Sequence, residues 1–170
     1  MPVQHLNHAV LFVRDVAVSS AFYRDVLGFR VKVEMPGRAV VRQAEGSTND
    51  HDLGLFQVGA GAGPSQAGRR TVGLYHLAWE VDTLAELARI RGALTHAGAL
   101  VGASDHATTK ALYAQDPDGL EFEVSWLLPA DLITPEVDAA GATTLPLDLA
   151  AEIARYGADT RGGIGVSVPA

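Results

Sequence analysis

The sequence predicts an α+β fold built from two successive βαβββ modules and a C-terminal extension. Apolar strand-like segments alternate with amphipathic helical segments, and the order of one strand, one helix and three strands occurs twice. In addition, His8 and His76 stand 68 positions apart (76 − 8), at equivalent places in the first strand of each module. The expected parts are modules at 1–58 and 73–128, a linker at 59–72 and the extension at 129–170.

The composition is that of an acidic chain with an ordered core. Of its 170 residues, 48% are hydrophobic and 19% are charged, a balance that supports a well-buried interior. The net charge of −7, without any stripe of lysine or arginine, makes nucleic acid an unexpected partner. The chain has no cysteine, and no apolar run approaches the roughly 18 residues that a membrane span needs. We therefore expect a cytoplasmic protein that does not associate with membranes.

The first module begins with an apolar strand expected at 6–13. Asp15 then predicts the N-cap of a helix, which Gly28 ends where left-handed geometry favours glycine. Pro36 and Gly37 predict the turn of a hairpin. The remaining strands of this module are expected at 29–35, 38–43 and 53–58.

The second module follows a Gly- and Ala-rich segment, 59–68, whose composition is typical of a flexible linker. A strand is expected at 74–81, and Thr83 with Glu86 forms a capping-box pair that predicts the start of the next helix, which ends before Gly98. The later strands are expected at 99–104, 111–115 and 120–126.

The extension is expected to contain one short helix at about 147–156. Pro146 is tolerated in a first helical turn, and Gly157 can end the helix. The rest of the extension is expected to form a tail or a flap over the site.

The last strand of the second module carries acidic side chains on one face. Asp116, Pro117, Asp118 and Gly119 predict a hairpin turn before it. Because strand side chains alternate, Glu121 and Glu123 share a face, and this parity cannot choose between them. A carboxylate on a largely buried strand needs a partner, and a metal ion is one such partner.

His8, His76 and Glu123 converge if the two modules pack as pseudo-symmetric halves of a curved mixed sheet. Two imidazoles and one carboxylate make the facial triad of Fe(II) enzymes that handle dioxygen. The first-module position equivalent to Glu123 is near Leu55 (123 − 68), which cannot bind a metal. Coordination positions would therefore remain open for substrate and oxygen.

Residues 4–128 resemble the vicinal oxygen chelate superfamily, also called the glyoxalase, bleomycin-resistance and extradiol-dioxygenase superfamily. The resemblance rests on the two first-strand histidines and on the glutamate that follows the Asp-Pro-Asp-Gly turn. It implies that His8, His76 and Glu123 are metal ligands and that the paired modules form a cup around the metal.

Two further segments are similar to the extradiol branch of this superfamily. Residues 49–56 resemble its His-rich entry into the last strand of a module, which implies a catalytic role for His51 beside the oxygen site. Residues 104–113 resemble the stretch that leads into an active-site tyrosine, which implies catalytic roles for Tyr113 and His106. Asp50 stands where many relatives carry another histidine. From the residues alone, His51 could also be a loop residue and Tyr113 an ordinary strand tyrosine.

The function implied is that of an Fe(II)-dependent extradiol dioxygenase, which cleaves the ring of a catechol-type vicinal diol with O₂. His51 would donate a proton to reduced oxygen, and Tyr113 would orient the diol. Mn(II), Zn(II) and Ni(II) are alternative metals. The alternative functions are a glyoxalase-like isomerase, a thiol-transferring resistance enzyme and a metal-free small-molecule-binding protein. By fold analogy we also expect a homo-oligomer.

Overall fold

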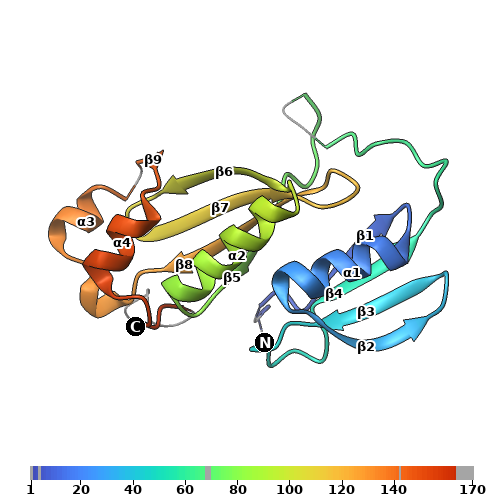
Figure 1. The fold of residues 1–170 in the computed structure, drawn as a ribbon, viewed down its shortest axis with the longest axis horizontal. Coiled ribbons are helices and arrows are strands. Elements are labelled where there is room, and N and C mark those ends of the chain that lie inside the picture. The colour runs from blue at the N-terminus through green and yellow to red at the C-terminus, as the bar shows by residue number, and fades with distance from the viewer. Residues whose placement is uncertain (1, 4, 68–69, 142, 164–170) are drawn as a thin grey trace. The chain divides into compact units, whose positions relative to one another are not determined.

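The computed structural model describes residues 2–3, 5–67, 70–141 and 143–163 of the chain. It divides into two units, each an α+β arrangement with one mixed sheet (Figure 1). Unit 1 comprises Met1–Gln66 and Asp116–Gly119, and unit 2 comprises Ala67–Gln115 and Leu120–Ala170. Parts of the expected linker, at 68–69, and of the expected extension, at 142 and 164–170, lie outside the described residues.

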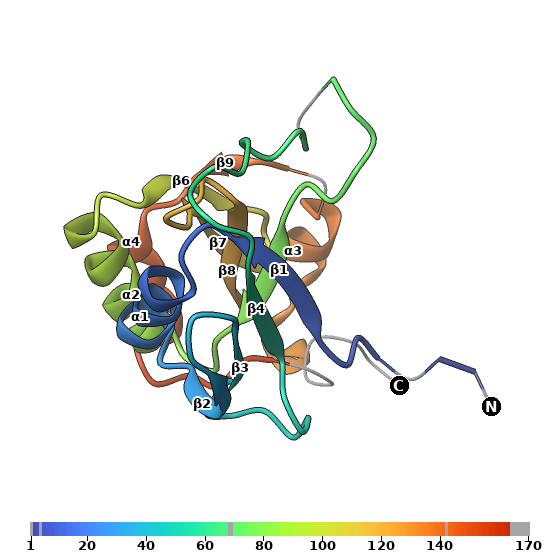
Figure 2. The same ribbon diagram turned by 90° about the vertical axis from the view of Figure 1, so that its right-hand side faces the viewer.

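Unit 1 has the order strand, helix and three strands that the sequence predicts. Its elements are β1 (Ala9–Val13), α1 (Val16–Leu27), β2 (Arg30–Met35), β3 (Ala39–Gln43) and β4 (Leu53–Gln57). The sheet order is β1-β4-β3-β2, with β1 parallel to β4 and the other pairs antiparallel. Strands β1 and β4 therefore lie side by side (Figure 2).

Unit 2 repeats this topology and adds to it. Its elements are β5 (Leu77–Glu80), α2 (Leu84–His96), β6 (Leu100–Asp105), β7 (Thr109–Gln115), β8 (Glu121–Leu127), the 3₁₀ turn η1 (Ala130–Leu132), α3 (Pro135–Ala139), β9 (Leu145–Pro146) and α4 (Leu149–Tyr156). The sheet order is β5-β8-β7-β6-β9, with β5 parallel to β8. The α+β class and the internal repeat are confirmed.

The helices begin at the side chains that the sequence predicts. Asp15 accepts hydrogen bonds from the backbone N–H groups of Ala17 and Val18 at the start of α1. Gly28 ends that helix with φ of 73°. In unit 2, the Thr83 side chain accepts from the N–H of Glu86. The predicted N-caps of both helices and the glycine end of α1 are therefore confirmed, whereas the Glu86 carboxylate pairs with Arg89.

The start of α4 differs from the prediction. The helix begins at Leu149 and is capped by Asp148, whose side chain accepts from the Ala151 N–H. Pro146 lies before it, in the short strand β9 at the edge of the sheet, and not in the first helical turn. An edge position suits proline because it has no N–H to donate to the sheet.

The first strand of each module is shorter than expected. Strand β1 begins at Ala9, which pairs with Leu53, and β5 begins at Leu77, which pairs with Phe122. The preceding residues have no partner strand in these registers, so the predicted starts at residues 6 and 74 are wrong. His8 and His76 accordingly sit one position before the strands rather than inside them.

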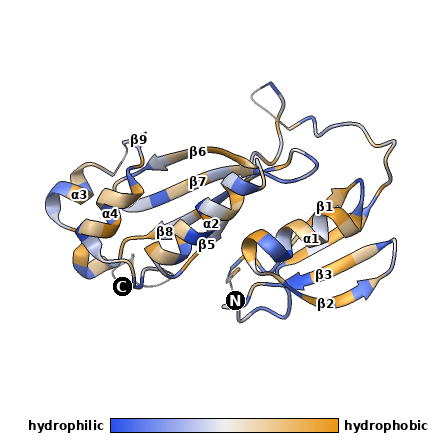
Figure 3. Cartoon of the chain, in the orientation of Figure 1, coloured by the Kyte–Doolittle hydropathy of each residue, from blue (hydrophilic) through white to orange (hydrophobic). Residues whose placement is uncertain are grey.

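Each sheet has one face covered by helices and apolar side chains. In unit 1, Val13, Leu53 and Leu55 are fully buried. In unit 2, Trp126 is fully buried, as are leucines of α2. Apolar residues run along β1 and β3 (Figure 3). Among the described residues, no helix has the length and apolar character required to cross a membrane.

Candidate active site

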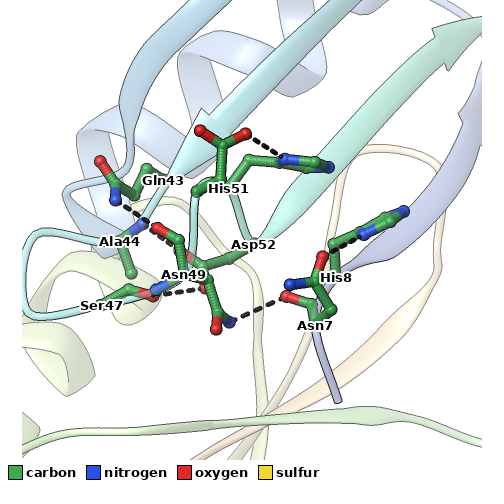
Figure 4. Close-up of polar contacts among 9 residues, drawn as sticks. Asn7, His8, Gln43, Ala44, Ser47, Asn49, His51 and Asp52 are labelled. Atoms are coloured by element: carbon green, nitrogen blue, oxygen red, sulfur yellow. Dashed lines mark hydrogen bonds and ion pairs between the residues drawn. The ribbon is translucent and has the colours of Figure 1, made fainter. Parts of the chain in front are cut away.

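In unit 1, His8 and His51 lie beside one another (Figure 4). Their ring centroids are 4.4 Å apart. His8 Nδ1 is 2.7 Å from Oδ1 of Asn7, which is an acceptor, so Nδ1 carries the proton and Nε2 keeps its lone pair. His51 Nδ1 is 3.0 Å from Oδ2 of Asp50 in the same way. Both histidines thus present Nε2 for other partners.

A polar network holds the loop that carries His51 against the segment before β1 (Figure 4). Asn49 Nδ2 donates to the Asn7 carbonyl at 2.8 Å and to Asp52 Oδ1 at 2.9 Å. Asp52 is buried and also accepts from Ser47 Oγ at 2.6 Å and from the Ala44 N–H at 2.8 Å. Satisfied buried networks of this kind fix geometry. Sequence reasoning missed this network, although Asp52 adjoining an apolar strand was a signal for it.

In unit 2, the imidazole of His76 and the carboxylate of Glu123 face one another. His76 Nε2 lies 3.4 Å from Glu123 Oε2, and the two side chains are 26% and 13% exposed. Among the described residues, the buried Nδ1 of His76 has no hydrogen-bond partner. Two ligands of one metal at about 2.1 Å from it lie roughly 3 Å apart when they are at right angles. The spacing of His76 Nε2 and Glu123 Oε2 therefore fits two ligands of one cation, whereas the unsatisfied Nδ1 lies on the other side of the ring.

The structure separates the two glutamates of β8. Glu123 pairs in register with Ala78 of β5 and lies near His76. Glu121 lies near Gln115, whose Nε2 is 3.4 Å from the carboxylate Oε1. Glu123 is thus the carboxylate that unit 2 sets beside a histidine.

Tyr113 and His106 form a hydrogen-bonded pair in the same unit. The Tyr113 hydroxyl is 2.8 Å from His106 Nε2, and the Tyr113 ring centroid is 6.1 Å from that of His76. Partial burial raises the pKa of Tyr113 above its ordinary value, and the charges of Glu123 and Tyr75 raise it further. The hydroxyl therefore keeps its proton at neutral pH. Tyr75, whose ring centroid is 4.7 Å from that of His76, is a neighbour that sequence reasoning missed.

The register of the sheets corrects the position equivalent to Glu123 in unit 1. Glu123 pairs with Ala78, and Val10 at the matching place in β1 pairs with Gly54. The equivalent residue is therefore Gly54 and not Leu55, which is fully buried on the helix-covered side. The two modules differ by one residue before their last strands, and a one-residue shift exchanges the faces of a strand. Gly54 has no side-chain donor either.

The predicted site residues fall into two groups. Unit 1 brings His8 together with His51, and unit 2 brings together His76, Glu123 and Tyr113, with His106 bonded to Tyr113. Within the described parts of the chain, no three histidine, cysteine, aspartate or glutamate side chains form a complete metal-binding group. The convergence of His8 with the unit 2 pair stays a prediction. Nitrogen and carboxylate donors of this kind suit Fe(II), Mn(II) and Zn(II) alike.

Comparison with known proteins adds independent findings. The sequence model of the Glyoxalase/Bleomycin resistance protein/Dioxygenase superfamily matches residues 5–124. The catechol-2,3-dioxygenase of Bacillus subtilis (strain 168) is 32% identical over 120 residues. That match covers 71% of this chain and 40% of the relative, so the chain corresponds to less than half of that protein's length.

Solved structures with a similar fold include the following two. A glyoxylase/bleomycin resistance protein/dioxygenase domain from Frankia sp. EAN1pec has a TM-score of 0.61 at 22% identity, over 73% of this chain and 92% of that one. A mutant of the fosfomycin resistance protein FosX from Listeria monocytogenes has a TM-score of 0.55 at 17% identity, over 72% and 90%. That structure is a complex with Mn(II) and a dihydroxypropylphosphonic acid.

Proposed function

The chain belongs to the Glyoxalase/Bleomycin resistance protein/Dioxygenase superfamily, and we propose that within it the protein is an extradiol dioxygenase that cleaves a catechol-type diol with O₂. The observation that carries this proposal is the arrangement in unit 2, where the facing pair His76 and Glu123 lies beside the hydrogen-bonded pair Tyr113 and His106. The likeness to a catechol-2,3-dioxygenase supports it.

We propose His8, His76 and Glu123 as the ligands of an Fe(II) ion. Bound there, the metal would hold the two oxygens of the diol and let electrons pass from the ring to O₂. The residues of the chain supply the remainder of the chemistry. Both atoms of O₂ enter the ring-opened product, a hydroxymuconic semialdehyde in the case of catechol, so the reaction needs no external reductant.

His51 is proposed to act as the proton donor and acceptor for the oxygen that is reduced during ring cleavage. Asp50 accepts the hydrogen bond of Nδ1, which leaves Nε2 to accept and return a proton. The hydrogen bond to His51 holds the pKa of Asp50 below its ordinary value, so Asp50 is ionised at neutral pH. The Asp50 carboxylate thus orients the His51 ring by accepting from Nδ1, so that Nε2 faces the reacting oxygen.

Tyr113 is proposed to orient the diol. Its hydroxyl proton faces His106 Nε2, so its oxygen can accept the hydrogen bond of a substrate hydroxyl. When the diol loses a proton, Tyr113 can take it while passing its own to His106. Burial raises the pKa of Tyr113, so the hydroxyl keeps the proton that it donates to His106.

A metal-dependent transferase or isomerase of the same superfamily is the second candidate. FosX, a fosfomycin resistance protein with the same fold, has a structure that holds Mn(II), which motivates this candidate. Such enzymes need no O₂. The presence of His51 and Tyr113 beside the proposed ligands favours the dioxygenase, because these residues supply the proton transfers that ring cleavage requires.

The test is reconstitution of the purified protein with Fe(II) without oxygen, followed by addition of a panel of simple and bulky catechols in air. Oxygen uptake and the absorbance of the yellow ring-opened product are recorded together. We expect one O₂ consumed for each product formed. Glu123→Gln should lose bound iron and turnover, because an amide is a weaker ligand than a carboxylate.

Glu121→Gln is the matched control, since it makes the same change two residues along the same strand face. It should retain iron and turnover. Turnover in Glu123→Gln with loss in Glu121→Gln would overturn the ligand assignment. Tight iron binding without oxygen uptake on any catechol would overturn the dioxygenase and favour the isomerase or transferase. The expected homo-oligomer and cytoplasmic location stay predictions.

A further inference from the structure

The C-terminal extension contacts His106 on the side opposite Tyr113. His106 Nδ1 is 3.1 Å from the carbonyl oxygen of Thr143 and 3.3 Å from Thr144 Oγ1. His106 Nε2 is 2.8 Å from the Tyr113 hydroxyl. The ring is therefore held at both nitrogens. Thr143 and Thr144 lie outside residues 5–124, the part of the chain that matches the superfamily.

The chemistry of these contacts decides which nitrogen of His106 carries the proton. A carbonyl oxygen can only accept, so the bond to Thr143 requires a proton on Nδ1. In the neutral ring Nε2 is then the acceptor, and Tyr113 must donate its O–H to it. Turning the hydroxyl this way leaves the lone pairs of the Tyr113 oxygen available to a substrate.

The extension also contacts the turn that carries His106 through a strand pairing and an ion pair. Strand β9 pairs with the end of β6, where Leu145 lies opposite Asp105. Asp105 Oδ1 accepts from the Ala107 N–H at 2.8 Å and from Lys110 Nζ at 2.5 Å. The same lysine, 1% exposed, lies 2.9 Å from Glu152 of α4. Strand pairing and a buried ion pair thus fix the turn independently of the contact with Thr143.

The turn needs such support because Ala107 has φ of 63°, in the left-handed region that residues with a side chain rarely adopt. This conformation is unfavourable for a residue other than glycine because its Cβ lies too close to the following carbonyl oxygen. The hydrogen bond from Ala107 to Asp105 and the strand β9 keep it in place. Without the extension, the orientation of the His106 ring would have fewer constraints.

We propose that the Thr143 carbonyl fixes the tautomer of His106 and thereby aims the Tyr113 hydroxyl for the diol. His106 is in this account a positioning residue that acts through Tyr113. The effect of this tautomer on the diol rests on the proposed function. The tautomer itself is a property of the metal-free protein and can be observed without substrate. The extension then contributes to the site through one backbone atom.

The test begins with the metal-free protein and needs no substrate. The ring nitrogens of the six histidines are observed by two-dimensional ¹H–¹⁵N NMR above the ordinary histidine pKa of about 6.5. His106→Gln removes one set of signals and so assigns His106. We expect protonated Nδ1 and unprotonated Nε2. A proton on Nε2 in the neutral ring would overturn the proposal.

Two changes of loop length test whether Thr143 is responsible. Deletion of Thr144 and insertion of one glycine after Thr144 both displace the carbonyl, whereas Thr143→Ala keeps it. Thr143→Ala should retain the Nδ1 tautomer, and the two length variants should lose it. Two variants are used so that one that fails to fold does not decide the result. Tryptophan fluorescence reports folding, since Trp126 is fully buried in unit 2.

The turnover rate of the length variants is the second measurement. Misplacement of a positioned group by about 1 Å can cost 10²-fold in rate, so we expect kcat to fall by about that factor in the length variants with little change in KM. Length variants that keep both tautomer and kcat would overturn the inference. If the wild type has the expected tautomer but cleaves no catechol, the proposed function fails while the fixing of His106 by Thr143 stands.

Discussion

The two sheets have the same topology but carry different side chains at matched positions. The register-matched residues are Val10, Gly54 and Val41 in unit 1 and Ala78, Glu123 and Tyr113 in unit 2. Both modules keep a histidine directly before the first strand. The repeat therefore preserves the place of one ligand, while the neighbouring strands supply a carboxylate and a phenol in only one of the two copies.

Packing explains why unit 1 holds no carboxylate at the matched position. A Cβ on Gly54 would lie 3.3 Å from Phe56 Cε2 and 3.4 Å from Val10 Cγ2. These contacts are tight, so a glutamate there would have to displace the phenylalanine. Val10 is 52% exposed and Phe12 is 71% exposed, and they make this face apolar. Unit 2 therefore carries most of the proposed acid–base chemistry, with His51 as the exception.

The largest expected effect is on iron binding and turnover, and it distinguishes the proposed roles of His8 and His51 in unit 1. His8→Asn should lose bound iron, and with it turnover. His51→Asn should keep iron but lower kcat by about 10²–10⁴-fold, the usual contribution of a general acid or base. Iron content after gel filtration and steady-state rates with catechol measure both. His96→Asn, at the exposed end of α2, is the control. Equal iron loss in His8→Asn and His51→Asn would contradict the assignment.

The next effect compares the buried cations of the two units. Lys110 lies between the carboxylates of Asp105 and Glu152, whereas Arg42 donates to Ser20 and to the Phe29 carbonyl. Lys110→Met leaves two carboxylates without their cation and should cost about 3–5 kcal/mol of unfolding free energy. Arg42→Met leaves neutral acceptors and should cost about 2 kcal/mol.

Urea unfolding measures the free energy of unfolding of both variants, and the tryptophans allow unit 2 to be followed separately. Both tryptophans of the chain, Trp79 and Trp126, belong to unit 2, so fluorescence follows that unit while circular dichroism follows the whole chain. Lys110→Met should lower the fluorescence midpoint. Equal losses for Lys110→Met and Arg42→Met would show that the charge of the partners does not matter.

The sequence was sufficient for much of the fold because local chemistry decides it. Asp15, Thr83 and Gly28 mark helix ends through hydrogen bonds and backbone angles that depend on neighbouring residues alone. The turn before β8 is equally local, with the Asp118 N–H bonded to Asp116 Oδ1 and Gly119 at φ of 80°. Elements whose signals lie within a few residues are therefore predictable.

Long-range register and backbone contacts were not predictable in this way. The histidine spacing of 68 assigned Leu55 to the place of Glu123, whereas strand pairing assigns Gly54. One residue of difference in length between the modules leaves no local mark. The Thr143 carbonyl that meets His106 is a group every residue carries, so no side-chain pattern could indicate it. The Asn49 network likewise joins segments far apart in the chain.

A smaller effect distinguishes two tyrosines at alkaline pH. Burial, and then the charge of Asp116, raise the pKa of Tyr23 well above its ordinary value of about 10, more than that of Tyr113 is raised. Above pH 10 the unfolded chain ionises Tyr23 while the folded chain keeps its proton. The stability that Tyr23 contributes is thus present below pH 10 and falls by about 1.4 kcal/mol per pH unit above it. Urea unfolding of wild type and Tyr23→Phe at pH 9 to 11 tests this, since the variant should show a shallower loss.

The smallest expected effect compares the helix caps of the two units. Asp15 accepts from two backbone N–H groups, at 2.8 and 3.2 Å, while Thr83 accepts from one, at 3.2 Å. A charged cap also interacts favourably with the positive end of the helix dipole. Asp15→Ala should therefore cost about 1 kcal/mol and Thr83→Ala about 0.5 kcal/mol. Asp15→Asn keeps the acceptor without the charge and should recover most of the loss at high salt, where the dipole term is screened. The free energy of unfolding is measured by tryptophan fluorescence for unit 2 and by circular dichroism for the whole chain. A larger loss of stability for Thr83→Ala than for Asp15→Ala would contradict the ranking by number of hydrogen bonds.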